Sequence, residues 1–102
     1  MFWVYLLASG WRGTLYVGVT SNIIQRVHQH KQGIADGFTR RHDVKSLVWF
    51  EDTPSAVGAI SREKQLKNWK RAWKVALVEQ ENPQWRDLYP WILGEEGAWR
   101  PG

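Results

Sequence analysis

Residues 14–31 read TLYVGVTSNIIQRVHQHK, and the pattern of this stretch changes at its midpoint. Apolar residues recur at every second position from Leu15 to Val19, as in a half-buried strand. Asn22 then supplies an N-cap side chain, and Gln25 follows at the spacing of a capping box. The stretch therefore predicts a strand, a turn and a short helix as one continuous unit.

The polar side chains of this unit are of kinds that bind anions. Tyr16 lies on the predicted strand, and Gly18 beside it allows a ligand or a second backbone to approach closely. Arg26 and His30 are four residues apart, so they lie side by side on the predicted helix. We interpret Tyr16, Arg26 and His30 as candidates for an anion site.

Length and composition indicate one domain. The chain has 102 residues, enough for one hydrophobic core but not for two, and its eight tryptophans place much aromatic mass in that core. With no cysteine, neither a disulfide nor a thiolate metal site can form. The longest apolar run, Phe2–Ala8, is too short to span a membrane. We expect a cytoplasmic protein with no membrane partner, a domain at 1–89 and a flexible C-terminal tail at 90–102.

The net charge of +4 suggests a polyanionic partner. Cations are concentrated between Ser61 and Lys74, where Glu63 is the single acid. That density is typical of a surface that faces phosphates, but a solvated helix face has the same pattern, and the sequence leaves both readings open. The candidate nucleic-acid-binding residues are Lys64, Lys67, Lys70, Arg71 and Lys74, together with Arg40 and Arg41.

The segments around the first helix predict the rest of the sheet. The apolar run at 2–8 and the strand at 14–20 form a hairpin, because a turn with two glycines joins them. A helix is expected at 22–32, a polar loop at 33–44 and a third strand at 45–51.

A long helical pattern runs from 56 to about 80, with Thr53 as its expected N-cap and Pro54 at its first helical position. A break near Trp69–Arg71 divides this pattern into two helices. Its expected core-facing stripe is Leu66, Trp69, Trp73 and Leu77.

Glu63 lies at the edge of the expected apolar stripe, where a carboxylate needs a partner. The ordinary interpretation is an ion pair with Lys67, four residues further along the helix.

Taken in chain order, these residues resemble the GIY-YIG nuclease superfamily, and in particular its small stand-alone bacterial members. The first half-motif is WVY at 3–5, with tryptophan in place of the usual glycine, and the second is YVG at 16–18. Arg26 stands at the spacing of the family's essential arginine, and His30 stands where members carry His or Tyr. Glu63 matches the family's metal-binding glutamate.

The likeness continues through 69–73 and 82–89, with Asn68 and Asn82 as candidates for an asparagine that some members carry late in the domain. It implies an α+β fold, a three-stranded antiparallel sheet flanked by helices in the order β-β-α-β-α-α, in agreement with the elements predicted above. It also implies an endonuclease that hydrolyses nucleic acid, expected to be DNA. Because the chain has no room for an added targeting domain, we expect low sequence specificity, or dependence on a protein partner or a homodimer.

The resemblance implies a role for each site residue. Glu63 would hold one Mg²⁺, or Mn²⁺, with waters completing its coordination, and Arg26 would clamp the phosphate oxygens. Tyr16, hydrogen-bonded to Tyr5, is the first candidate for the general base. An ordinary phenol pKa near 10 requires the metal or Arg26 to stabilise phenolate. His30, with an ordinary pKa in the right range, is the second candidate for base or proton relay.

Two other functions stay open from the sequence. One is a nucleic-acid-binding module that keeps the fold and the basic surface but has lost turnover. The other is a small interaction domain in which the aromatic C-terminal segment binds a protein. Metal-dependent cleavage distinguishes the enzyme from the binding module, and nucleic-acid binding at low salt distinguishes both from the interaction domain.

Overall fold

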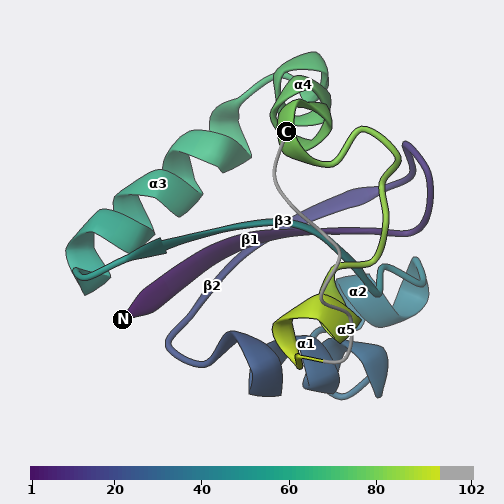
Figure 1. The fold of residues 1–102 in the computed structure, drawn as a ribbon, viewed down its shortest axis with the longest axis horizontal. Helices are drawn as coiled ribbons and strands as arrows, with labels where there is room; N and C mark the ends of the chain where they lie inside the picture. Colours follow the sequence, from purple (N-terminus) through teal and green to yellow (C-terminus); the bar gives the residue numbers. More distant parts are fainter. Residues whose placement is uncertain (95–102) are drawn as a thin grey trace.

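A computed structural model describes residues 1–94, so the last eight residues of the expected tail at 90–102 lie outside the described part. The predicted α+β class is confirmed, as is the predicted order of the strands and main helices; α2 and α5 are additional (Figure 1). In chain order the elements are β1 (Phe2–Ala8), β2 (Leu15–Thr20), α1 (Ile23–Lys31), α2 (Gly37–Arg41), β3 (Ser46–Thr53), α3 (Ala56–Asn68), α4 (Arg71–Glu81) and α5 (Tyr89–Ile92).

β1 is the central strand of an antiparallel sheet in the order β2-β1-β3. In this register Tyr5 lies opposite Gly18 of β2 and Phe50 of β3. Residues from Val4 to Ala8 are all buried, because helices cover both faces of β1. A strand buried on both faces needs apolar side chains at successive positions, which explains the unbroken apolar run of β1.

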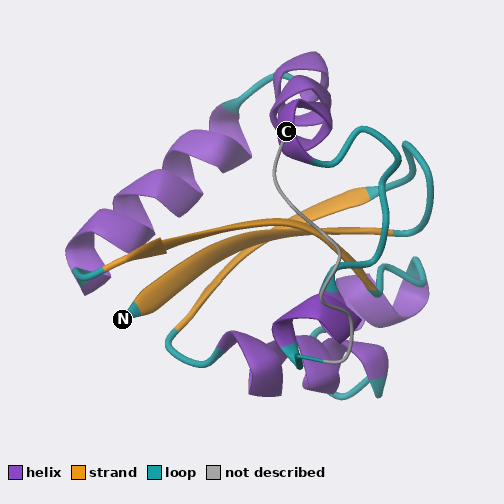
Figure 2. Ribbon diagram, viewed as in Figure 1, coloured by secondary structure: helices purple, strands orange, loops and turns teal. Residues whose placement is uncertain are grey.

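The helices form two layers around the sheet. α3 and α4 cover one face, and α1, α2 and α5 cover the other (Figure 2). Successive residues of β1 point to opposite faces and therefore contribute to different cores. The core on the α3 and α4 side includes Leu6, Trp49, Leu66 and Val78. The core on the α1 and α5 side includes Tyr5, Leu7, Val27, Leu47 and Leu88.

Gly18 is required by the position of Tyr5 on the neighbouring strand. A Cβ added at position 18 would lie 2.8 Å from Tyr5 Cε2 and closer still to the hydroxyl end of the ring. Any side chain there would displace the tyrosine. The close approach predicted beside Tyr16 is therefore made by the Tyr5 side chain.

Trp3, at the position of the motif glycine, is accommodated at one end of the sheet. Its ring meets Phe50 edge to face, with centroids 6.0 Å apart. Trp91 of α5 stacks on the same phenylalanine, also at 6.0 Å. Trp3 and Trp91 of α5 therefore pack on the same phenylalanine, and residues 90–92 of the expected tail belong to α5. No helix within residues 1–94 combines the length and apolar composition needed to cross a membrane.

The cap of α1 is confirmed, whereas the expected cap of α3 is wrong. Asn22 accepts a hydrogen bond from the Gln25 N–H at 3.1 Å, as an N-cap does. Thr53 instead belongs to β3, which continues further than its sequence pattern indicates. Ser55 caps α3 by accepting a backbone N–H of the first turn at 3.1 Å, so Pro54 precedes the cap.

The predicted loop at 33–44 contains a short helix. Asp36 caps α2 by accepting the Phe38 N–H at 2.7 Å. Thr39 is buried within α2, and its hydroxyl donates to the Asp36 carbonyl at 3.0 Å. The loop prediction is wrong at 37–41 because these local hydrogen bonds stabilise a single helical turn in a glycine-rich, polar segment.

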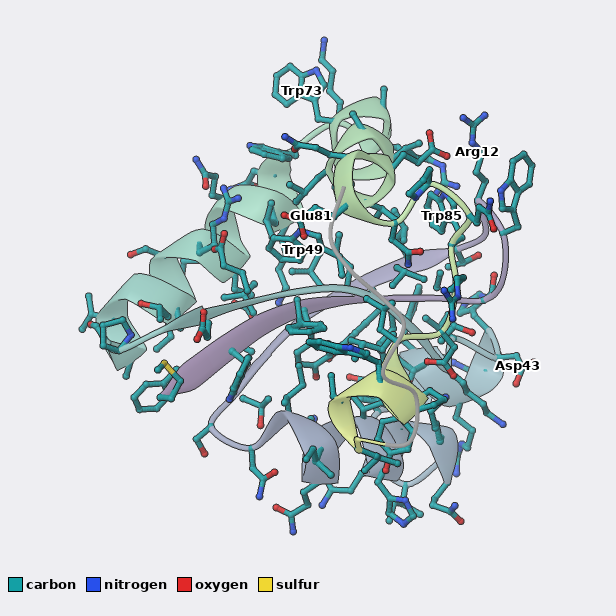
Figure 3. All side chains as sticks on the ribbon, in the orientation of Figure 1. Arg12, Asp43, Trp49, Trp73, Glu81 and Trp85 are labelled. Carbon is teal, nitrogen blue, oxygen red and sulfur yellow. The ribbon has the colours of Figure 1, made fainter. Side chains whose placement is uncertain are left out.

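The predicted break in the long helical pattern is confirmed at Trp69 and Lys70, whose backbones are extended with ψ of 147° and 149°. Because the chain changes direction there, the expected core stripe is interrupted. Leu66 is buried, but the Trp73 side chain is 52% exposed. It points away from the sheet in Figure 3, so its prediction as a core residue is wrong.

Asn82 anchors the chain after α4. Its side-chain amide donates to the carbonyls of Val48 and Arg86, at 3.1 and 2.9 Å, and its oxygen accepts the Arg86 N–H at 3.1 Å. These bonds hold the segment after α4 against β3. Asn82 is therefore a structural residue.

Candidate active site

Tyr5, Tyr16 and His30 form an aromatic cluster between the sheet and α1. The ring centroids of Tyr16 and His30 are 5.2 Å apart, and those of Tyr5 and His30 are 5.8 Å apart. Phe38 of α2 stacks on Tyr16 with a centroid distance of 6.2 Å. Two strands and two helices thus contribute to one site.

A chain of hydrogen bonds passes through buried His30. Tyr5 Oη lies 2.9 Å from Nε2, and Thr39 Oγ1 lies 3.1 Å from Nδ1. Thr39 donates its only hydroxyl proton to the Asp36 carbonyl, so its oxygen accepts Nδ1–H of the neutral imidazole. Nε2 then accepts the proton of the Tyr5 hydroxyl. Tyr5 therefore directs its proton at His30.

Burial determines the protonation states of this pair. Burial, and after it the charge of Arg26, lower the pKa of His30 from 6.5 to about 4, and Asp36 opposes both effects. Burial likewise raises the pKa of Tyr5 to about 12, although a hydrogen bond from Arg26 favours the ionised form. Both side chains are uncharged at neutral pH. The expectation that His30 titrates near neutrality is therefore wrong.

We predict that His30 makes the fold sensitive to acid. Its pKa is lower in the folded protein than in the unfolded chain, so the unfolded chain binds a proton first between pH 6.5 and about 4. The free energy of unfolding contributed by neutral His30 is complete above pH 6.5 and falls by about 3 kcal/mol as the pH approaches 4. Urea unfolding across this range should show that loss in the wild type and a flatter profile in His30→Gln.

His28 is exposed on the same helix and provides the control. The His28→Gln variant should keep the pH profile of the wild type. Parallel profiles for His30→Gln and the wild type would contradict the assignment of a buried neutral imidazole.

Tyr16 lies beside an ionised carboxylate. Its hydroxyl donates to Asp36 Oδ2 over a long 3.4 Å contact. Burial and then the charge of Asp36 raise the pKa of Tyr16, whereas Arg26 lowers it. The hydrogen bond from the Phe38 N–H lowers the pKa of Asp36. At neutral pH the phenol therefore keeps its proton next to a charged acceptor.

Asp36 and Thr39 were missed as site residues by the sequence analysis. Both lie in the segment interpreted as a polar loop. The available signal was an N-cap pattern, in which an aspartate stands three residues before a threonine. The threonine hydroxyl can then donate a hydrogen bond to the carbonyl of the aspartate. The pattern predicts a helical turn, but not that the turn lies against Tyr16 and His30.

Arg26 supplies a cation that lacks a carboxylate partner. Its guanidinium donates to Gln29 Oε1 at 3.2 Å and alters the pKa of both tyrosines. Across the described residues it forms no ion pair, in contrast to Arg12, which a carboxylate binds at 2.8 Å. A partly buried cation in this state is placed to bind an anion from outside the protein.

Glu63 approaches the cluster from α3. Its charge adds to burial and Asp36 in raising the pKa of Tyr16. Its side chain is 17% exposed and forms an ion pair with Lys67 at 3.4 Å, as the ordinary interpretation of the sequence expected. The carboxylate therefore lies near enough to the cluster to affect Tyr16, and within residues 1–94 its one ion-pair partner is exposed Lys67.

The donor set at Glu63 is sparse. Within residues 1–94 no three His, Cys, Asp or Glu side chains are grouped to hold a metal ion. A single carboxylate fits Mg²⁺, which keeps several waters and takes further oxygens from a phosphate substrate. It does not fit zinc, which needs three or four protein ligands.

A groove of about 300 Å³ runs along the outer edge of β2 beside the cluster. β2 is an edge strand, so no neighbouring strand covers this side. Two of the predicted phosphate-binding cations, Lys67 of α3 and Lys74 of α4, border the groove. Its lining is Leu15, Tyr16, Val17, Phe38, Lys67 and Lys74.

The other predicted cations are placed differently. Arg71 donates to the carbonyls of Arg12 and Gly13, at 2.6 and 2.9 Å, and so holds α4 to the β1–β2 turn. Glu79 of α4 strengthens the same connection by binding Arg12 at 2.8 Å. The remaining cations are exposed and lie outside the lining of the groove: Lys64, Lys70, Arg40 and Arg41.

Comparison with known proteins is consistent with this geometry. The family model described as the GIY-YIG catalytic domain matches residues 1–76. The chain is 37% identical over 79 residues to a UPF0213 protein of Natronomonas pharaonis, covering 78% of this chain and 92% of the relative. It is 36% identical over 83 residues to one of Syntrophus aciditrophicus, covering 80% and 93%.

A UPF0213 protein of Aeromonas salmonicida is 32% identical over 90 residues, which span 87% of this chain and 65% of the relative. No solved structure was found to match the chain. The matched domain contains the tyrosine cluster, Arg26, Glu63 and the groove beside β2. The chain therefore belongs to the GIY-YIG family.

Proposed function

We propose that the protein is a metal-dependent endonuclease that hydrolyses phosphodiester bonds in DNA with low sequence specificity. Membership of a nuclease domain family supports nuclease-like chemistry on nucleic acid. The observation that carries the proposal is the position of Arg26, a partly buried cation with no carboxylate partner within residues 1–94. It lies beside the Tyr16–Asp36 pair, and Lys67 and Lys74 border the same groove.

In this proposal Arg26 binds the non-bridging oxygens of the scissile phosphate. A guanidinium presents a planar fork that matches two such oxygens, and it neutralises the charge that develops on them. Tyr5 orients this guanidinium. Because the Tyr5 proton is directed at His30, its oxygen lone pairs accept from Arg26. His30 and Thr39 are thus positioning residues for the phosphate clamp.

Tyr16 takes the proton of the attacking water while its own proton passes to Asp36. The water oxygen forms the new bond to phosphorus, and the bond between phosphorus and the leaving sugar oxygen breaks. The carboxylate at 3.4 Å is the destination of the tyrosine proton. This transfer avoids a free phenolate, which burial and Asp36 disfavour by raising the pKa of Tyr16. A positioned base contributes about 10²–10⁴ to a rate.

Glu63 is the residue that would hold Mg²⁺ or Mn²⁺. When bound there, the ion supplies positive charge for the phosphoryl oxygens and the leaving group. Lys67 borders the groove next to Glu63 and holds a neighbouring phosphate of the strand.

The test is cleavage of fluorescent single-stranded, duplex and branched DNA in Mg²⁺, Mn²⁺ or EDTA. Cleavage is expected with either ion and not with the chelator, and on many sequences. Binding of the same substrates is measured in EDTA by fluorescence anisotropy at low and high salt. Absence of cleavage of every substrate with both ions would reject the proposal, and one sharply preferred sequence would reject low specificity.

A nucleic-acid-binding module without turnover is the second candidate. It is favoured by one observation, that burial raises the pKa of both Tyr5 and Tyr16, so that neither phenol is ionised at neutral pH. In that case anisotropy would report salt-sensitive binding, and no product would form with any ion. Sedimentation of the active species would show a homodimer as twice the mass of the chain, and a protein partner that supplies specificity as an additional component.

A further inference from the structure

Trp73 is an exposed aromatic residue with no role in the active site. It lies on α4, just after the break that separates this helix from α3, and 52% of its surface is exposed. In Figure 3 its ring projects from α4 away from the sheet, whereas Trp49 lies between the sheet and the helices. Trp73 therefore contributes little to the core, and an indole held in water has a cost unless a partner covers it.

A shallow groove of about 540 Å³ lies beside this ring, larger than the groove at the active site. The Trp69 and Trp73 rings meet at 86° with centroids 6.1 Å apart. The two indoles therefore pack edge to face. The lining is Trp69, Trp73, Ala76, Leu77 and Gln80.

A cation lies over each of the two indoles. Lys70 Nζ lies 5.6 Å from the Trp73 ring centroid, and the Arg62 guanidinium lies 5.3 Å from that of Trp69. An apolar segment of a protein would use the floor of this groove but would gain nothing from the cations. A nucleotide uses both features, because its base stacks on the Trp73 indole and its phosphate binds Lys70.

Residues that line this groove and the active-site groove are neighbours in sequence on α4. Lys74, the residue after Trp73, lines the active-site groove together with Tyr16. The two grooves therefore border α4 at adjacent residues, Lys74 and Trp73. A duplex keeps its bases paired and stacked, so only an unpaired nucleotide can present a base face to the indole.

We propose that Trp73 and the groove beside it bind an unpaired nucleobase of the substrate strand, with Lys70 on the adjacent phosphate. This inference rests on the proposed function and gives the substrate class: DNA with a single-stranded segment, such as a flap or a branch. Trp73 is then a specificity residue for substrate structure and takes no part in the hydrolysis.

The test measures binding in EDTA by anisotropy, using a fluorescein-labelled oligothymidylate, a blunt duplex and a duplex with a single-stranded flap. Loss of one stacking contact in Trp73→Ala is expected to weaken binding of the single strand and the flap about tenfold or more. Binding of the blunt duplex should change little, and Trp73→Phe should recover most of the loss. Cross-linking of an iodouridine-substituted strand should label the peptide that contains Trp73.

Trp11→Ala is the matched control, because Trp11 is 66% exposed and also has an arginine, Arg12, 5.1 Å from its ring. This variant should bind all three probes as the wild type does. Circular dichroism and thermal unfolding check that each variant is folded.

Three results would overturn the inference while the proposed function stands: unchanged single-strand binding in Trp73→Ala, an equal loss on duplex and single strand, or a change in oligomeric state on sedimentation. The last would make the groove a protein interface. If the wild type binds no probe even at low salt, the proposed function itself fails.

Discussion

Replacing Arg26 with lysine is expected to slow DNA cleavage by about 100-fold or more. The proposed clamp uses two parallel N–H groups of one guanidinium, and a lysine ammonium cannot reproduce that fork. Loss of one preorganised donor to the developing charge typically lowers the catalytic rate about 10²–10³-fold. Single-turnover cleavage with saturating enzyme measures this step without the contribution of binding.

The Arg26→Lys variant keeps the positive charge, so DNA affinity in EDTA should fall far less than the cleavage rate. Arg12→Lys is a suitable control, because Arg12 binds Glu79 at the β1–β2 turn. Its cleavage rate should stay close to that of the wild type. A cleavage rate for Arg26→Lys within a few-fold of the wild type would show that Arg26 contributes only a charge.

Replacing Glu63 with glutamine should abolish metal-dependent cleavage, with a decrease of at least about 100-fold. Removing a metal ligand forfeits several kcal/mol of charge stabilisation in the transition state, and each 1.36 kcal/mol is a factor of ten. The fold should tolerate the change, because the ion pair with exposed Lys67 contributes about 1 kcal/mol or less. Cleavage across a Mg²⁺ titration, with thermal unfolding of both proteins, measures the two effects separately.

Glu51→Gln provides the matched carboxylate control, since Glu51 forms an ion pair with Arg62 at 3.1 Å on the surface between β3 and α3. That variant should cleave DNA normally. Should Glu63→Gln recover full activity at high Mg²⁺, the role of Glu63 would be limited to metal affinity. Full activity at ordinary Mg²⁺ would place the metal elsewhere.

The local structure was predictable wherever one short pattern determines it. The alternation that ends at Val19 and the cap at Asn22 identify β2 and α1 because both signals lie within a few residues of the elements. The exposure of Trp73 was not predictable in this way. Projection of 56–80 as one helix aligned Trp73 with Leu66, but the extended backbones at the break rotate α4 relative to α3.

The sequence identifies candidate site residues but not the contacts between them. The four-residue spacing places Arg26 and His30 on one side of α1, and that needs only helix geometry. The partner of Tyr5 is 25 residues away in sequence and depends on how α1 packs against β1. The lowered pKa of His30 depends on burial, and burial results from the packing of the whole fold. Asp36 is missing from the prediction because α2 is too short to have a periodic pattern.

The two halves of the site differ in the free energy needed to open them. β1 carries Tyr5, is hydrogen-bonded along both edges and is buried on both faces. We therefore expect its amides to exchange with solvent only when the whole domain unfolds. α2 has five residues and brings Asp36 and Phe38 to Tyr16 through one helical turn. Opening that turn breaks only a few local bonds. Tyr5, which orients the proposed phosphate clamp, therefore lies on the most persistent strand of the molecule, whereas the proposed acceptor of the Tyr16 proton lies on a part that can open by itself.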